Sequence, residues 1–201
     1  MIADWSDESL RVGWVGGLYI EFGGLGLMIN ATEGTTERWN ACFDPSLLEM
    51  IAVSDGEIRS LGGLLPLLCS LERRSELRIW APMGEERPAY LAEAWSRGWP
   101  NRYPLGVEAE FPGGSFRLGD MKITSIGLRR STEVAFRIDA GGRKIGFLPS
   151  GYHEAVVRHL RRMDLLVVIG DLNDVSQVGS LEPEQLWALN ADGHPLEMGE
   201  S

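Results

Sequence analysis

The chain has 201 residues, of which 44% are hydrophobic and 24% charged, and a formal net charge of −10 at pH 7. This is the composition of an ordinary folded protein, and the length suits one domain, 1–201, with a substantial core. The negative charge argues against nucleic acid as a partner, because non-specific binding depends on Lys and Arg contacts with phosphates.

The sequence carries no signal for a membrane or for export. No apolar run approaches the roughly 18–20 residues of a membrane span, so we expect no membrane partner. Residues 1–9 are acidic and lack the basic and apolar regions of a signal peptide, so a cytoplasmic protein is expected. Cys42 and Cys69 show no Cys-x-x-Cys spacing and are expected to be buried free thiols.

The first third of the chain reads as short β-rich runs separated by pairs of glycines. These runs predict three strands, at 12–15, 18–22 and 25–29. An Asp-Pro-Ser sequence then predicts the start of a brief helix at 47–50.

A second apolar run, at 50–53, ends in a polar turn and leads into a longer apolar segment. Residues 61–71 are apolar nearly all round, which predicts a buried helix. Ser60 stands directly before this segment and is predicted to be its N-cap. The charged residues 72–76 are predicted to be the exposed exit of the helix.

The middle of the chain contains one strand and one helix, followed by a second β-rich part. A strand is predicted at 77–80, and helical spacing predicts a helix at 88–97 that Gly98 ends. Four further runs with glycine turns between them predict a second group of antiparallel strands: 107–116, 122–128, 134–138 and 144–148.

The last quarter begins with an amphipathic helix, predicted at 152–163. Residues 165–169 are continuously apolar, which predicts a strand covered on both faces. After this strand the sequence no longer favours β-structure, and a helix is predicted at 181–189. The last ten residues are expected to be disordered. The order of β-run, helices, β-run and helix predicts an α/β (α+β) fold, an αββα sandwich.

The turn after the apolar run at 50–53 reads Ser-Asp-Gly-Glu-Ile-Arg-Ser-Leu-Gly-Gly. This strand, turn and helix resemble the metallo-β-lactamase superfamily, whose signature His-x-His-x-Asp-His-x-x-Gly lies on such a loop. Aligned on the glycines, the four ligand positions fall on Asp55, Glu57, Arg59 and Ser60. Arg59 brings a permanent positive charge and Ser60 no strong ligand. The resemblance therefore implies a degenerate metal motif.

A narrower resemblance is to the coenzyme PQQ synthesis protein B family, which writes the loop as Asp-x-Glu-x-Asp-His. Asp55 and Glu57 fit that version better than the parent signature. Relative to this family the chain is shortened at its C-terminus. The other similar segments, in family order, are 28–31, 77–82, 144–172 and 192–195.

This resemblance implies a function and a ligand class. The relatives resembled oxidise a peptide-derived tyrosine with bound iron, which implies a tyrosine-bearing peptide as ligand and a role in cofactor or natural-product biosynthesis. A Gly-His-x-Pro segment of the family supplies a ligand, and His194 stands in the similar segment here. Ser150 stands where the wider superfamily places a metal-bridging aspartate.

The carboxylates Asp55 and Glu57 admit two interpretations. They could form a residual metal site or an acid–base pair. They could instead cap the following helix, or lie in water with Arg59 as counter-ion. His153 and His159 lie six residues apart, do not share a helix face, and are expected at the surface.

A metal site would have to draw on few residues. An iron or zinc site needs imidazoles or thiolates beside carboxylates. The candidates are oxygen-rich and short of nitrogen, so no cofactor is expected, and zinc or iron enters only under the alternative function. The residual candidates are Asp55, Glu57, Asp171 and His194.

Three functions remain open. The leading hypothesis is a pseudoenzyme that binds a small-molecule or peptide ligand, or a protein partner, through the former active-site cleft. Trp99 and Tyr103, if placed at the mouth of that cleft, would favour ligand binding. The alternative is a metal-dependent oxidoreductase or hydrolase with an oxygen-rich site. The third is an interaction module, one half of a dimer such as a homodimer.

Overall fold

The computed structural model describes residues 1–5, 9–55, 57–73, 75–99, 102–128, 133–150, 156–171, 176–190, 192 and 194–196. For Asp4, Ile58, Arg59 and Val157 it describes the backbone only. The chain forms two compact units, each built on one β-sheet. Unit 1 comprises 1–111 and 118–120, and unit 2 comprises 112–117 and 121–201. The expectation of a single domain stays a prediction.

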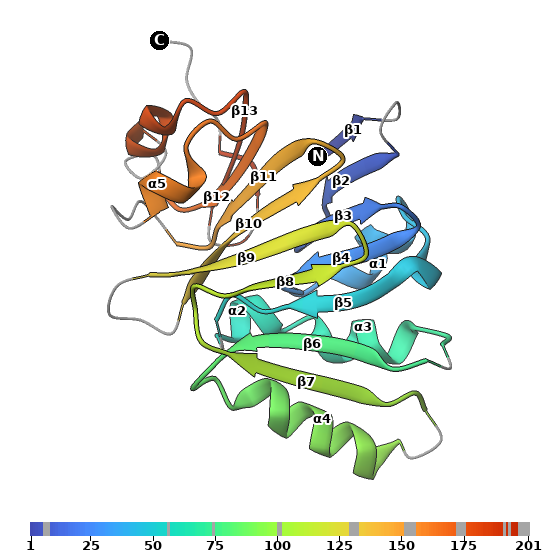
Figure 1. Cartoon of the computed structure of the whole chain (residues 1–201). Coiled ribbons are helices and arrows are strands. Elements are labelled where there is room, and N and C mark those ends of the chain that lie inside the picture. The colour runs from blue at the N-terminus through green and yellow to red at the C-terminus, as the bar shows by residue number, and fades with distance from the viewer. Residues whose placement is uncertain are drawn as a thin grey trace. The chain divides into compact units, whose positions relative to one another are not determined.

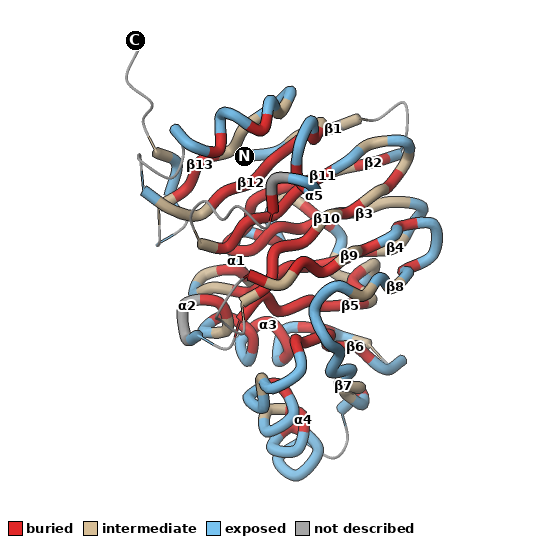
Figure 2. Tube along the Cα trace, turned by 60° about the vertical axis from the view of Figure 1, so that its left-hand side comes forward, coloured by how far each residue is buried: buried red, intermediate tan, exposed pale blue. Residues whose placement is uncertain are grey.

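Unit 1 contains a seven-stranded sheet in the order β1-β2-β3-β4-β5-β6-β7 (Figure 1). The strands β1 to β4 form an antiparallel meander, and β4 to β7 pair in parallel. The inner strands are buried along most of their length (Figure 2), which explains their nearly continuous apolar sequences. The bounds are Ile2–Trp5 (β1), Leu10–Trp14 (β2), Leu18–Phe22 (β3), Leu25–Ile29 (β4), Leu48–Ala52 (β5), Leu77–Pro82 (β6) and Leu105–Glu110 (β7).

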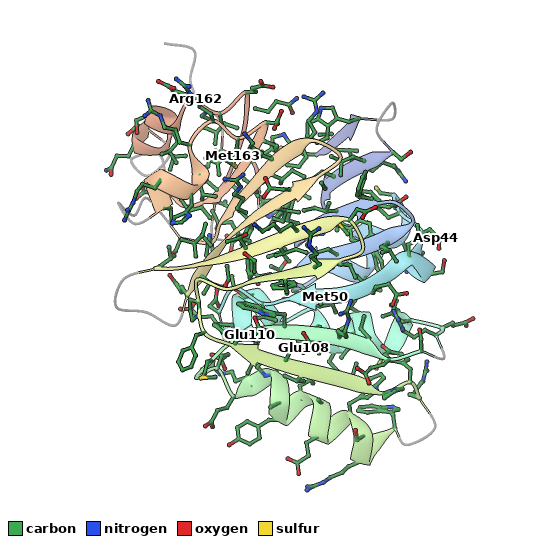
Figure 3. All side chains as sticks on the ribbon, viewed as in Figure 1. Asp44, Met50, Glu108, Glu110, Arg162 and Met163 are labelled. Carbon is green, nitrogen blue, oxygen red and sulfur yellow. The ribbon has the colours of Figure 1, made fainter. Side chains whose placement is uncertain are left out.

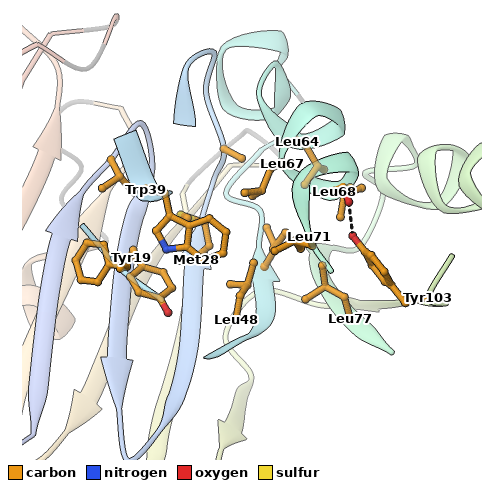
Figure 4. Packing of buried hydrophobic residues seen from close by; sticks show 14 of the residues in the cluster. Tyr19, Met28, Trp39, Leu48, Leu64, Leu67, Leu68, Leu71, Leu77 and Tyr103 are labelled. Atoms are coloured by element: carbon orange, nitrogen blue, oxygen red, sulfur yellow. Dashed lines mark hydrogen bonds between the residues drawn. The ribbon is translucent and has the colours of Figure 1, made fainter. Parts of the chain in front are cut away.

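Among the described residues of unit 1, four α-helices and a short 3₁₀ helix accompany this sheet. The buried side of α3 packs on the sheet in one apolar cluster, as the sequence predicts for the motif helix (Figure 4). In that cluster the leucines of α3 contact residues of the strands and of α1. The helix bounds are Thr35–Asn40 (α1), Pro45–Leu47 (3₁₀), Ile58–Leu61 (α2), Leu64–Ser70 (α3) and Arg87–Gly98 (α4).

Unit 2 contains a six-stranded sheet in the order β13-β12-β11-β10-β9-β8. The strands β9, β10 and β11 pair antiparallel, whereas β11, β12 and β13 pair in parallel. The predicted mixed α+β class is therefore confirmed. The bounds are Ser115–Leu118 (β8), Met121–Gly127 (β9), Val134–Ala140 (β10), Arg143–Leu148 (β11), Val157–Leu160 (α5), Leu165–Ile169 (β12), Gly179–Leu181 (3₁₀) and Gln185–Leu189 (β13).

The elements around the motif turn differ from the prediction in two places. The brief helix expected at 47–50 is wrong, because the 3₁₀ helix Pro45–Leu47 ends there and β5 begins at Leu48. The helix expected at 61–71 is divided into α2 and α3 at Gly62 and Gly63. The backbone N–H of Gly63 donates to the carbonyl of Ala31 at 2.8 Å instead of continuing the helix.

The helix expected at 181–189 is wrong, because Gln185–Leu189 forms β13 beside β12. Glu182 has a left-handed backbone, with φ at 55°, which no helix contains. Parallel pairing that buries Ala188 and Leu189 outweighs the local preference. Pro195 also forms a β-bridge with Leu189, so the described part of the last ten residues is paired.

The helix expected at 152–163 ends earlier in the structure than predicted. Residues 152–155 lie outside the described chain, and α5 covers only Val157–Leu160. Arg162 has φ at 54°, and its N–H donates to the carbonyl of Leu181 at 2.8 Å. The backbone therefore leaves the helix before Met163.

The remaining elements follow the prediction more closely. The strands at 18–22, 25–29 and 165–169 are confirmed, and the helix at 88–97 is confirmed with Gly98 as its last residue. The run at 107–116 contains two strands, β7 and β8, which belong to different sheets. The sequence did not predict β1 or α1.

Arg73 lies in the segment predicted to be an exposed exit, yet its side chain is only 9% exposed. Its guanidinium donates to the carbonyl of Leu48 and, at 2.9 Å, to the carboxylate of Glu49. It also lies over the ring of Tyr103, 5.8 Å from the centroid. Arg73 therefore joins the segment after α3 to the start of β5.

The strand β7 is an edge of the first sheet and carries Glu108 and Glu110 (Figure 3). Both are exposed. Charged side chains on an edge strand hinder pairing with another edge. This edge is therefore poorly suited to joining two copies of the chain.

Two expectations from composition can be compared with the structure. Both cysteines are free, but Cys42 is only half-buried and Cys69 is exposed, so burial of the thiols is wrong. Every helix within the described residues is too short or too polar to cross a membrane.

Candidate functional site

The motif turn follows the carboxyl end of β5, which lies between the parallel strands β4 and β6. The N–H of Val53 still pairs with β6, donating to the carbonyl of Trp80 at 2.9 Å. The chain then turns through Ser54 and Asp55 and enters α2 at Ile58. The carboxyl ends of parallel strands are where open α/β sheets place their ligands.

Asp55 is the centre of a buried hydrogen-bond network. Its side chain is 2% exposed. One carboxylate oxygen, Oδ2, accepts from the hydroxyl of Ser54 at 2.8 Å and from that of Ser60 at 2.9 Å. The other, Oδ1, accepts from the backbone N–H of Glu57 at 2.8 Å. Three donors therefore surround the carboxylate that occupies the first ligand position.

Asn30 extends this network to the end of β4. Its amide nitrogen donates to the hydroxyl of Ser54 at 2.8 Å, and its amide oxygen accepts from the N–H of Ser54 at 2.8 Å. The Asn30 backbone is left-handed, with φ at 60°, a conformation that Asn tolerates better than most residues. The sequence offered 28–31 only as a family similarity and did not predict this contact.

Gly63 holds the other side of the turn against the chain that follows β4. A β-carbon at Gly63 would lie 1.8 Å from the carbonyl oxygen of Thr32, so no other residue fits without movement of the backbone. The N–H of Ala31 donates to the carbonyl of Ser60 at 2.9 Å. The residues after β4 therefore fix the C-terminal end of α2.

The structure brings together two of the four motif residues, Asp55 and Ser60. Ser60 lies within α2 and bonds Asp55, so its predicted role as N-cap of a helix at 61–71 is wrong. The side chain of Glu57 is exposed, and Glu57 contributes its backbone N–H to the network around Asp55. The side chain of Arg59 lies outside the described structure, so its predicted pairing stays a prediction.

Asp171 and His194 belong to unit 2, and both are exposed. Asp171 follows β12. The N–H of His194 donates to the side-chain oxygen of Asn190 at 2.9 Å, which closes a short loop after β13. The backbone of His194 therefore helps to form this turn.

The other residues singled out in the sequence fall in different places. Tyr103 is buried and donates its hydroxyl to the carbonyl of Leu68 at 2.7 Å (Figure 4), so Tyr103 gives no support to ligand binding through a cleft mouth. Trp99 is 40% exposed and stacks on Trp95. His159 is exposed, as expected, and His153 lies outside the described residues. Ser150 donates to the carboxylate of Glu133.

The donor set of the turn does not fit a zinc or iron ion. Such ions take imidazole, thiolate or carboxylate ligands that converge on one point. Here the carboxylate of Asp55 accepts from three donors, and the hydroxyl of Ser60 is one of them. Among the described residues, no three side chains of His, Cys, Asp or Glu are grouped to hold one ion.

The fold places the chain in a known structural class. It is the metallo-β-lactamase fold, shown by similarity to solved structures of that class, and the predicted resemblance is confirmed at this level. No protein-family model and no curated protein matches the chain.

Three of the similar structures show the extent of the match. The metallo-beta-lactamase fold protein YhfI from Bacillus subtilis aligns over 86% of this chain and 77% of its own, with a TM-score of 0.70 and 13% identity. A diphosphatase from the PhnP family aligns over 88% of this chain and 74% of its own, with a TM-score of 0.66 and 14% identity. Zn(2+)-bound PqqB from Methylobacterium extorquens aligns over 81% of this chain and 63% of its own, with a TM-score of 0.61 and 15% identity.

Proposed function

We propose that this protein is a catalytically degenerate metallo-β-lactamase-fold protein that binds a small or peptide ligand without a metal ion. The observation that carries the proposal is the network around Asp55. A buried carboxylate that accepts from three donors gains its stabilisation from those donors and not from a cation. The residue in the first ligand position is thus part of the scaffold.

Metal binding would have to break this network. Removing one buried hydrogen bond to a charged group costs about 1.5–3 kcal/mol, and the donors left behind would lose their partner. Ser60, in the fourth ligand position, offers a hydroxyl that already donates to Asp55. Arg59, in the third, adds a positive charge to the same turn.

The proposed ligand lies at the turn after β5, where Glu57 presents an exposed carboxylate. Carboxyl ends of parallel strands are the common ligand edge of such sheets. The similarity of Asp55 and Glu57 to the coenzyme PQQ synthesis protein B motif favours a peptide that carries tyrosine. The corresponding role is in cofactor or natural-product biosynthesis.

The first test is elemental analysis of protein purified from zinc- and iron-supplemented cultures without chelators. We expect far less than one zinc or iron per chain. Finding about one tightly held ion per chain, lost in Asp55→Ala or His194→Ala, would favour instead the metal-dependent oxidoreductase or hydrolase.

The second test measures binding of a short tyrosine-bearing peptide by calorimetry, with and without a chelator. We expect saturable binding that the chelator leaves unchanged and that Glu57→Gln weakens. The same peptide with phenylalanine in place of tyrosine is the control for the phenol. Absence of binding to either peptide overturns the proposed ligand class, and binding that the chelator abolishes overturns metal independence.

A further inference from the structure

Four buried side-chain polar atoms of the described chain have no hydrogen-bond partner, and all of them come from two elements of unit 1. Tyr19 and Glu21 alternate along β3, so their side chains share one face of the sheet. Thr36 and Trp39 are three residues apart in α1, so they share one side of that helix. The atoms are the Tyr19 hydroxyl, Glu21 Oε2, Thr36 Oγ1 and Trp39 Nε1.

Tyr19 and Trp39 meet in the layer between β3 and α1. Both side chains are 0% exposed, and their ring centroids lie 5.5 Å apart (Figure 4). The indole N–H of Trp39 lies near enough to the phenol to lower its pKa, although no hydrogen bond of normal geometry joins the two. Burial, followed by the charge of Glu21, raises the pKa of Tyr19 more strongly, so the phenol keeps its proton.

Gly26 fixes the position of the phenol. A β-carbon at Gly26 would lie 2.2 Å from the Tyr19 hydroxyl oxygen, so the ring rests on the bare backbone of β4. The guanidinium of Arg11 forms an ion pair with Glu21 Oε2 at 3.6 Å and donates to the carbonyl of Cys42 at 3.0 Å. Neighbouring residues therefore hold Tyr19 and Glu21 in place, although the phenol hydroxyl and Glu21 Oε2 accept or donate no hydrogen bond within the described chain.

We infer that an ordered water molecule binds between β3 and α1, bridging Tyr19, Glu21 and Trp39. The groups fit water because the indole N–H can only donate, the carboxylate can only accept, and the phenol can do both. Buried waters typically make about three hydrogen bonds to polar groups of this kind. This water couples α1 to the sheet and is independent of the proposed ligand.

The test uses Tyr19→Phe, which removes only the hydroxyl. If water bridges this hydroxyl, the variant loses about one hydrogen bond and melts about 2–4 °C lower than the native protein. If the hydroxyl has no partner, its removal relieves a buried polar group and the melting temperature is unchanged or higher. Tyr103→Phe is the matched control, because that hydroxyl has a direct acceptor, the Leu68 carbonyl.

A second measurement detects the water in the unmodified protein. Nuclear Overhauser transfer from water to the indole proton of Trp39, assigned by its loss in Trp39→Phe, should have the sign of a long-lived bound molecule. Such a cross-peak together with a lower melting temperature for Tyr19→Phe is the expected result. Absence of the cross-peak, or a melting temperature that does not fall, overturns the inference.

Discussion

The hydroxyl of Ser60 donates to the carboxylate of Asp55 at 2.9 Å and so ties α2 to the end of β5. In the metallo-β-lactamase signature the corresponding positions would both hold a metal. Here one residue is the donor and the other the acceptor of a buried hydrogen bond. The loop keeps a cross-link at the same place, made by the side chains themselves.

Asp55→Ala should destabilise the protein strongly. It leaves two hydroxyls, on Ser54 and Ser60, and one backbone N–H without their acceptor in a buried site. We expect a loss of about 3 kcal/mol or more in the free energy of unfolding, measured by urea denaturation. Glu57→Gln, at an exposed carboxylate in the same turn, should change the value by less than about 0.5 kcal/mol. If the two variants lost the same free energy of unfolding, the proposed structural role of Asp55 would be wrong.

Gly63→Ala should prevent the turn from packing on the segment after β4. The new β-carbon would overlap the Thr32 carbonyl, which is backbone and cannot rotate away. We expect a loss of about 2 kcal/mol or more and faster amide exchange in α2, followed by hydrogen exchange. Gly98→Ala is the control, since a β-carbon there meets nothing within 4 Å and Ala favours the end of α4. A tolerated Gly63→Ala would contradict the close contact.

Arg73→Met should lower the free energy of unfolding far more than the charged sequence around Arg73 suggests. It keeps the apolar stem but removes the donor that Arg73 gives to the Leu48 carbonyl and the Glu49 carboxylate. We expect a loss of about 3 kcal/mol, and Arg73→Lys should recover little of it because an ammonium cannot reproduce the planar fork.

Arg97→Met is the matched control for Arg73. Arg97 pairs with Glu93 one turn away on α4, and its side chain is 78% exposed. An exposed pair contributes only about 0–1 kcal/mol, so thermal melting should barely change. If both variants melt alike, the contacts of Arg73 contribute no more than a surface pair.

The fold should lose stability in alkali. Burial raises the pKa of Tyr103 and of Tyr19 above the ordinary value of 10.0. Below pH 10 the folded and unfolded chains both hold these protons, and the full stability is present. Above it the unfolded chain releases them first, so the free energy of unfolding falls as pH rises. Urea denaturation from about pH 9 to about pH 11 should show this fall, and Tyr103→Phe should make it shallower. An unchanged slope would contradict the shift for Tyr103.

Strands with strong local patterns were predictable from the sequence, and elements decided by distant contacts were not. Residues 18–22 and 25–29 carry apolar runs between glycine pairs, and both are strands. Residues 181–189 contain several helix-favouring side chains, yet Gln185–Leu189 pairs with β12. A single sequence does not show which strand will lie beside a segment, so local preference misled the prediction there.

The candidate site was predictable in position but not in its chemistry. The turn at Asp55 could be located because an apolar run, a polar turn and two glycines follow one another. The partner Asn30 lies 24 residues before Ser54, and nothing local joins them. Arg73 was placed at the surface for the same reason, since a charged residue after a helix gives no sign of the carbonyls it reaches.

The paired hydrogen bonds between Asn30 and Ser54, and those around Asp55, bear on how a metal site could be introduced into this turn. A histidine at position 55 would take the acceptor from Ser54, Ser60 and the Glu57 N–H at once. Each single substitution toward the signature thus gives a less stable protein, and natural proteins have a free energy of unfolding of only about 5–15 kcal/mol. Asn30, Ser54 and Ser60 would have to change together. The hydrogen bonds of this turn therefore oppose the replacement of any one of these residues alone by a metal ligand.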